Sequence, residues 1–193
     1  MKSQKSSLLQ IAAIGTALAF LFSVTLAVLS KPGYRVGFNY LSDLGANNVG
    51  AYWFNYGMIA TAVFIFIFFT SLYKSHAKSQ IGKLGIAAGI IAALGLAAVG
   101  FFPENIEPQH FIASAVYFVT AMLSVLFISM SMKLEKTASW ITLLTGVLVV
   151  ISGVVFMATE LPLLENLAVA TFGLWVLSVA WQEQCEVYSN PAK

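Results

Sequence analysis

The chain has 193 residues, of which 59% are hydrophobic and only 9% are charged, whereas a soluble domain has roughly 25% charged residues. This composition excludes an ordinary water-soluble protein and predicts a membrane protein. The net charge is only +2 and the lysines are scattered, so the sequence predicts no nucleic-acid partner. Because Cys185 is the only cysteine, an intrachain disulfide and a CxxC redox pair are excluded as well.

Six apolar segments are long enough to cross a bilayer, since a helix needs about 20 apolar residues to span roughly 30 Å of hydrocarbon. They cover approximately residues 8–30, 52–73, 84–102, 110–132, 138–158 and 163–181. The first segment has a longer apolar stretch than the roughly 7 to 15 residues of a signal peptide, so we expect an uncleaved span. The sequence therefore predicts an all-α fold, a single-domain polytopic transmembrane bundle of six helices with one long outer loop, 31–51.

The distribution of basic residues predicts the orientation of this bundle. An even number of spans places both termini on one side, together with eight lysines, while only Lys31 and Arg35 fall on the other side. The positive-inside rule then predicts a multi-pass protein of the cell membrane with both termini in the cytoplasm. Five of the eight acidic residues fall on the outer side: Asp43, Glu104, Glu107, Glu160 and Glu165.

Small residues repeat along the third span, where Gly85, Gly89, Ala93 and Ala97 fall four apart on one face. Lipid provides no hydrophobic drive for helix association, so close approach at small residues must contribute. We expect this helix at the centre of the bundle, closely crossed by a neighbour. Small-residue faces could also carry a homo-oligomer or a contact with a larger membrane complex.

Hydroxyl residues repeat every seven positions in the first span, at Thr16, Ser23 and Ser30. We expect such residues to bond to carbonyls of their own helix or to hydroxyls of a neighbouring helix. The phenylalanine-rich run 63–69 of the second span has no polar face, and we expect it to face lipid. His76, on the lysine-rich connection that follows, is expected to be solvated.

A polar stripe runs down the fourth span through His110, Ser114, Tyr117 and Ser124. Because these positions share one helical face, the stripe descends from the outer surface into the bundle. Polar side chains within a membrane-spanning helix are costly and usually face the interior of the bundle or a water-filled cavity. The stripe therefore predicts a shallow cavity at the outer end of this helix.

The turn before this stripe concentrates ionisable residues. Pro103 disfavours helix at the residue before it, and Pro108 suits the first turn of the following helix. Glu104 and His110 are therefore held at the two ends of a short turn, where their side chains can approach each other.

The outer loop 31–51 is rich in glycine, asparagine and aromatic residues. Asp43 lies at its middle, and Arg35 is a candidate partner for that carboxylate. Aromatic residues such as Tyr34 and Tyr40 suit the membrane interface. We expect the loop to lean on the membrane surface and to fold over the mouth of the bundle as a lid.

Several motifs in this order resemble those of a known family: "YLSDLG" (Tyr40 to Gly45), "FNYG" (Phe54 to Gly57), "GFFPEN" (Gly100 to Asn105) and His110. The family is the domain-of-unknown-function family numbered 998, whose members are multi-helix membrane proteins of archaea and bacteria. The similarity spans most of the chain, and "SDLG" followed by an aromatic-Asn span is more distantly similar to the DRAM and Sfk membrane families. The resemblance implies the fold and transfers no reaction.

Two kinds of function remain open. In the first, the protein binds or processes a lipid or another amphiphile at a polar outer pocket, with His110 as general base and a carboxylate orienting it. The candidate catalytic residues are Asp43, Glu104 and His110. The candidate substrate-binding residues are Ser42, Arg35, Asn55, Ser114, Tyr117, Glu160 and Glu165. Ser42 is also a candidate nucleophile, and a metal variant would use the three candidate catalytic residues as ligands, although we expect no metal or other cofactor.

In the second kind of function the protein is not catalytic. Asp43, Arg35, Glu104 and His110 would then form a hydrogen-bonded clasp that fixes the loop, or the chain would be an accessory subunit of a larger membrane complex. Membrane lipids are the expected partners in either case. Transport is disfavoured, because the span centres lack ionisable residues and the halves show no clear repeat.

Overall fold

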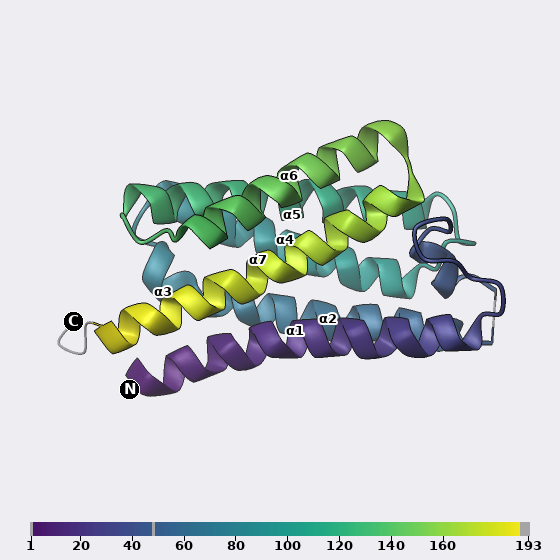
Figure 1. The fold of residues 1–193 in the computed structure, drawn as a ribbon, viewed down its shortest axis with the longest axis horizontal. Helices are drawn as coiled ribbons and strands as arrows, with labels where there is room; N and C mark the ends of the chain where they lie inside the picture. The colour runs from purple at the N-terminus through teal and green to yellow at the C-terminus, as the bar shows by residue number, and fades with distance from the viewer. Residues whose placement is uncertain (1, 48, 190–193) are drawn as a thin grey trace.

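Helices make up nearly all of the regular structure in the computed structural model of the protein, which describes residues 2–47 and 49–189. They are α1 (Lys2–Ser30), η1 (Ser42–Gly45), α2 (Ala51–Ser71), α3 (Tyr73–His76), α4 (Gln80–Phe101), α5 (Gln109–Leu134), α6 (Trp140–Thr159) and α7 (Pro162–Ser189). Six of the helices are long and apolar enough to cross a membrane (Figure 1). The predicted all-α bundle of six transmembrane helices is confirmed.

Local sequence explains where several helices begin and end. Pro103 comes two residues after the end of α4, directly after the C-cap Phe102, and Pro162 is the first residue of α7, where a missing amide hydrogen leaves no helical bond unmade. Ser79 caps α4 by accepting a hydrogen bond from the Gly82 amide at 3.0 Å. Ser139 caps α6 in the same way, so serine caps set both starts on one side of the bundle.

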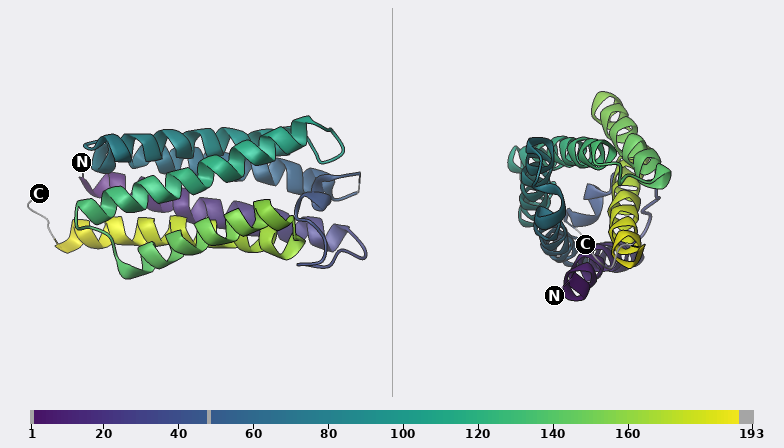
Figure 2. Two further views of the ribbon diagram at one scale, coloured as in Figure 1. Left: turned by 90° about the horizontal axis from the view of Figure 1, so that it is seen from above. Right: turned by 90° about the vertical axis from the view of Figure 1, so that its left-hand side faces the viewer.

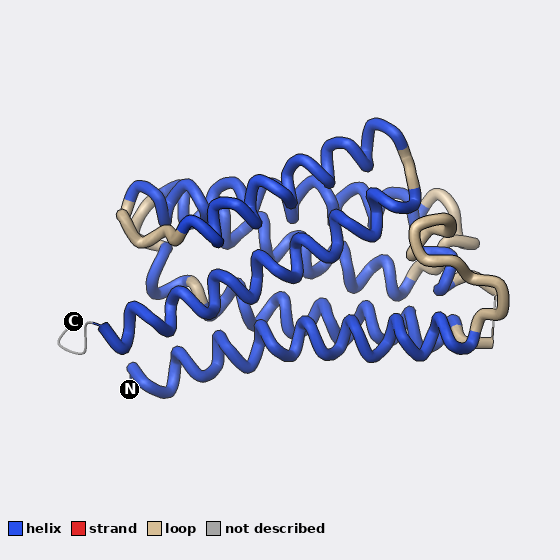
Figure 3. The backbone as a smooth tube through the Cα atoms, viewed as in Figure 1, coloured by secondary structure: helices blue, strands red, loops and turns tan. Residues whose placement is uncertain are grey.

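The connections gather at the two ends of the bundle, as the loops in Figure 3 show. We call one the terminal end, because α1 begins and α7 ends there (Figure 1). We call the other the loop end, which holds residues 31–47, 49 and 50, the turn 102–108 and the short connection between α6 and α7. Sequence-distant acids are thereby brought to one end of the molecule.

The six long helices surround a common core in which α4 lies between α2 and α5. The end-on view in Figure 2 shows α6 at the periphery, where it packs mainly on α7 and α5. A β-carbon added to Gly89 would come within 2.3 Å of the Phe69 ring of α2, and one added to Gly85 within 2.8 Å of Ile128 of α5. The predicted close crossing at α4 is confirmed, and this small-residue face packs within the chain rather than lying open to another subunit.

The hydroxyl groups of the spans bond as expected. Thr16 donates to the Ala12 carbonyl at 2.9 Å and Ser23 to the Phe20 carbonyl at 3.0 Å. A 3.1 Å hydrogen bond joins the hydroxyls of Ser152 on α6 and Thr171 on α7.

The expectation that the run 63–69 faces lipid is wrong for three of its seven positions. Ile65, Phe68 and Phe69 are fully buried, and both phenylalanine rings pack against the Trp175 ring of α7. Val63 and Phe66 do lie on the exposed face. Composition could not separate the two faces, because lipid and a membrane-protein core are equally apolar.

Candidate functional site

Two adjoining cavities open at the loop end. The first, the apolar cavity, has a volume of about 310 Å³ and lies between α1, α2, α4, α5 and α7. The second, the polar chamber, has a volume of about 300 Å³ and lies between the loop, α5, α6 and α7. Four residues line both: Ser42, Ser114, Phe118 and Glu165. The two cavities therefore meet, with a carboxylate and two hydroxyls at their junction.

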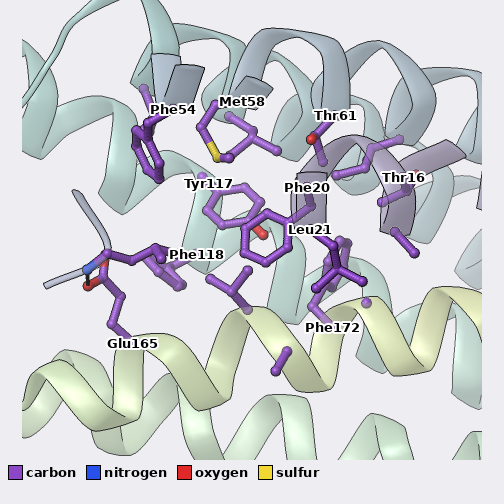
Figure 4. Close-up of a pocket in the computed structure, with 18 of the residues that line it drawn as sticks. Thr16, Phe20, Leu21, Phe54, Met58, Thr61, Tyr117, Phe118, Glu165 and Phe172 are labelled. Atoms are coloured by element: carbon purple, nitrogen blue, oxygen red, sulfur yellow. Dashed lines mark hydrogen bonds between the residues drawn. The ribbon is translucent and has the colours of Figure 1, made fainter. Parts of the chain in front are cut away.

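The apolar cavity is a long pocket whose walls are almost entirely hydrocarbon. In Figure 4, Glu165 lies near one end and Thr16 near the other, with rings such as Phe172 between them. Leu21 of α1 and Leu174 of α7 line the cavity and are also 59% and 56% exposed. The cavity therefore reaches the lipid-facing surface between α1 and α7.

The outer loop covers the junction through hydrogen bonds in each of which one partner is a backbone group. The Leu41 amide donates to Glu165 Oε2 at 2.6 Å, and the Tyr40 hydroxyl donates to the Glu160 carbonyl at 2.6 Å. Asp43 shapes the roof by accepting from the Tyr40 amide at 2.9 Å, and its own carbonyl accepts from the Lys31 ammonium. The loop is thus fastened to the first turn of α7 and to the end of α6.

Glu104 occupies an acidic setting in the chamber. Partial burial raises the pKa of its carboxyl, and the Asp43 carboxyl, which lies within hydrogen-bonding reach, raises that pKa further. Lys31 and Ser42 act in the opposite direction but do not cancel the increase. Burial likewise raises the pKa of Tyr34 to about 12, and its hydroxyl has no hydrogen-bond partner among the described residues.

The raised pKa of Glu104 predicts a pH-dependent stability. The native state holds this proton more tightly than the unfolded chain does, so the contribution is fully present below the ordinary pKa of 4.5 and is lost as the pH rises through the raised value. Glu104→Gln, which stays neutral, should therefore raise the melting temperature at neutral pH and lose that advantage below pH 4.5. The gain should stay below about 1 kcal/mol, because solvent screens a half-buried group.

Thermal unfolding in detergent across a pH series measures this effect. Glu107→Gln, at the exposed rim of the same chamber, is the matched control and should change the melting temperature little. A Glu104→Gln variant that is less stable than the wild type at every pH would show instead that the ionised carboxylate holds the roof.

His110 lines the polar chamber and is held by backbone. Its Nδ1 lies 2.7 Å from the Phe102 carbonyl, which can only accept, so Nδ1 carries a proton. In the neutral ring Nε2 is then an acceptor, and it faces the Ser114 hydroxyl at 3.4 Å. The expected orienting carboxylate is therefore not what holds this ring; a main-chain carbonyl takes that place.

The remaining predicted residues have different surroundings. Tyr117 lines the apolar cavity and is buried, with its ring edge-on to Phe172. Asn55 lines neither cavity; its Nδ2 donates to the Gly45 carbonyl at 3.1 Å and thereby ties η1 to α2. Arg35 is exposed on the loop and also lines neither cavity.

The metal variant of the catalytic hypothesis does not fit the geometry. Among the side chains that the structure describes, those of residues 7–47 and 49–185, no three or more His, Cys, Asp or Glu are grouped so that they could hold a metal ion. The ring nitrogens of His110 instead face Phe102 and Ser114.

At the terminal end, the expectation that His76 is solvated is wrong. The residue is only 1% exposed. Its Nε2 lies 2.9 Å from Glu183 Oε1 on α7, and its Nδ1 lies 3.4 Å from Glu135 Oε2 at the end of α5. The Glu135 contact lacks hydrogen-bond geometry, so the Glu183 contact is the stronger one. Glu135 and Glu183 are predicted from the sequence to lie on the same side of the bundle as His76. These two acids were the sequence feature that could have indicated a paired histidine.

Sequence reasoning also missed the walls of the apolar cavity. Phe20, Phe54, Met58 and Phe172 line it, yet each occurs in a run of apolar residues that looks like any other span. Gly173 was the one usable signal, because a glycine inside a helix needs a reason. A β-carbon added there would meet no atom within 4 Å.

Six apolar helices with a roofed pair of cavities at one end define a multi-pass membrane protein. Residues 13–182 match the family described as "Protein of unknown function (DUF998)", and the chain belongs to that family. The resemblance inferred from the sequence motifs is thereby confirmed. Neither the curated proteins nor the solved structures include a significant match.

Proposed function

We propose that the protein binds a single-chain amphiphile, with its chain in the apolar cavity and its head in the polar chamber. The observation that carries this proposal is the junction of the two cavities at Ser114, Phe118 and Glu165. Each cavity has a volume typical of a small-molecule site, roughly 300–1,000 Å³. Together they form a hydrocarbon-lined compartment next to a polar one. This arrangement matches an amphiphile, in which a hydrocarbon chain is joined to a polar head group.

The ligand enters sideways from the bilayer. Leu21 and Leu174 place an opening of the apolar cavity on the lipid-facing surface, between α1 and α7. A chain that moves through this opening stays in an apolar environment, so no hydrocarbon needs to cross water. The lysine bias of the terminal end supports an orientation with both termini in the cytoplasm, so the ligand comes from the outer leaflet of the cell membrane.

Gly173→Leu tests the proposal, because Gly173 lines the apolar cavity and a β-carbon added there meets no atom within 4 Å, so the leucine side chain would extend into the cavity. We expect binding of single-chain amphiphiles to weaken at least about tenfold. The melting temperature should stay equal or rise, because leucine is a better helix former than glycine by about 1 kcal/mol. Native mass spectrometry of the purified protein, titrated with alkylammonium, alkyl glycoside and alkyl sulfate compounds of one chain length, measures the bound amphiphile.

Ala60→Leu is the matched control, since it adds a similar side chain on the exposed face of α2, away from both cavities. This variant should bind as the wild type does. If none of the three amphiphiles binds the wild type, or if Gly173→Leu binds them equally well, the proposed function is wrong.

A second candidate function, hydrolysis of an ester-linked amphiphile, is favoured by the Ser114–His110 pair. Ser114 faces His110 Nε2, and Phe102 fixes the ring from the other side, which is the arrangement of a nucleophile, a base and an orienting group. The Ser114 hydroxyl would attack the ester carbonyl while Nε2 takes its proton and passes it to the leaving alcohol; water would then release the acid.

The same mass-spectrometric assay tests hydrolysis when it is run as a time course with an ester-linked single-chain amphiphile. Ser114→Ala and His110→Gln should abolish cleavage while binding persists. Cleavage that survives both substitutions, or that never occurs in the wild type, removes this candidate and leaves the binding proposal intact.

A further inference from the structure

The polar chamber has an unbalanced charge. Its lining includes four carboxylates and one imidazole, and no lysine or arginine of the described chain lines either cavity. The ionisable lining residues are Glu104, Glu107, Glu160, Glu165 and His110. Lys31 acts on Glu104 without lining the chamber, and its ammonium, which donates to the Asp43 carbonyl, supplies one positive charge against these four carboxylates. The chamber therefore has more acidic groups than nearby basic groups can balance.

Glu165 shows the imbalance most clearly. It is only 7% exposed and lines both cavities. The charged groups that act on it are Glu104 and Asp43, both acidic, and no ion pair with a basic residue is formed in the described structure. A buried carboxyl group is ionised at little cost only when an opposite charge lies beside it, which is what a cationic ligand would supply. The Leu41 amide satisfies Oε2 but brings no net charge.

Aromatic side chains line the same chamber. They are Tyr40, Phe111, Phe118 and Phe156. The ring centroids of Phe118 and Phe156 are 4.9 Å apart, at an interplanar angle of 56°. The faces of aromatic rings are partially negative and attract cations, and cages of such rings recognise alkylammonium groups. Carboxylates and aromatic faces thus favour the same kind of head group.

We propose that the ligand is a cationic amphiphile, a single hydrocarbon chain that ends in an amine or quaternary ammonium group beside Glu165. This inference rests on the proposed function and specifies its ligand. The ammonium group lies in the polar chamber against Glu165 and the rings of Phe118 and Phe156, and the chain continues past Ser114 into the apolar cavity. Anionic lipids are disfavoured, because their phosphate or carboxylate would face Glu104 and Glu160.

Competition among amphiphiles of one chain length tests the charge of the head group. The wild-type protein should bind a long-chain alkyltrimethylammonium or alkylamine at least about tenfold more tightly than the matched alkyl sulfate or alkyl glycoside. Glu165→Gln, which keeps shape and removes charge, should reduce that preference by about tenfold. Native mass spectrometry gives the affinities, and thermal unfolding shows that each variant is folded.

Glu183→Gln is the matched control on the same helix, since it removes a carboxylate at the opposite end of α7 and should leave the preference unchanged. Equal or tighter binding of the anionic or neutral compound overturns the inference, as does a folded Glu165→Gln variant with an unchanged preference. Such a result would leave the proposed function standing, because some amphiphile would still bind in a manner that Gly173→Leu blocks.

Discussion

Trp175→Ala is expected to lower the free energy of unfolding by about 3 kcal/mol. The indole is fully buried, where it packs against the rings of Phe68, Phe69 and Phe172. Its Nε1 donates to the Ser129 hydroxyl at 3.1 Å. The estimate is at the low end for a buried tryptophan, because the unfolded helices also lie in lipid and transfer from water contributes nothing. What is lost is close packing and one hydrogen bond.

Unfolding in mixed detergent micelles measures this loss. Trp181→Ala is the matched control, because Trp181 is on the same helix and 71% exposed. We expect the control to change stability by less than about 0.5 kcal/mol. Equal effects of the two substitutions would mean that α7 does not bury Trp175 against α2 and α5.

The six helices could be predicted because lipid leaves the backbone no other way to satisfy its hydrogen bonds. The ends of the spans could also be predicted where a residue acts on the backbone directly, as Pro103 and Pro162 do. Which side chains of a span are buried could not be predicted. Phe66 and Phe69 belong to one apolar run, yet Phe66 is exposed and Phe69 lies in the core. Within a membrane the contrast that separates inside from outside in soluble proteins is absent.

The residues of the polar chamber could be predicted in part, because an even number of spans sends Glu104, His110 and Glu165 to one end. The bonds that roof it could not. The Leu41 amide donates to Glu165, and the Tyr40 hydroxyl donates to the Glu160 carbonyl. Backbone groups occur at every position, so no pattern of side chains reveals which of them will be used.

The apolar cavity was the hardest feature to foresee, because it is a space and not a residue type. It exists where Gly173 leaves room beside α1 and where Leu21 and Leu174 do not close the gap. A sequence records the side chains that surround such a space only as further apolar residues. The function proposed here therefore depends on packing between helices that are far apart in the chain.

His76→Ala is expected to destabilise the protein by about 3 kcal/mol. The ring is almost completely buried between Glu183 of α7 and Glu135 at the end of α5. Removal of the imidazole leaves the Glu135 and Glu183 carboxylates near each other, without the protonatable ring that lies between them. The estimate is at the low end for a broken buried pair, because the Glu135 and Glu183 side chains are themselves 29% and 16% exposed. The effect reaches three helices at once, since α3, α5 and α7 share this contact.

A double-mutant cycle separates the ion pair from simple loss of packing. His76→Ala and Glu183→Gln should be non-additive by about 1 kcal/mol or more, because each removes the same 2.9 Å contact. Lys78→Ala, on the exposed part of the same connection, is the control and should have no measurable effect. If His76→Ala resembles Lys78→Ala, the histidine contributes no more than a solvated connector would. A large, coupled effect means that the terminal end is held together by charge, while the loop end keeps its carboxylates available for a ligand.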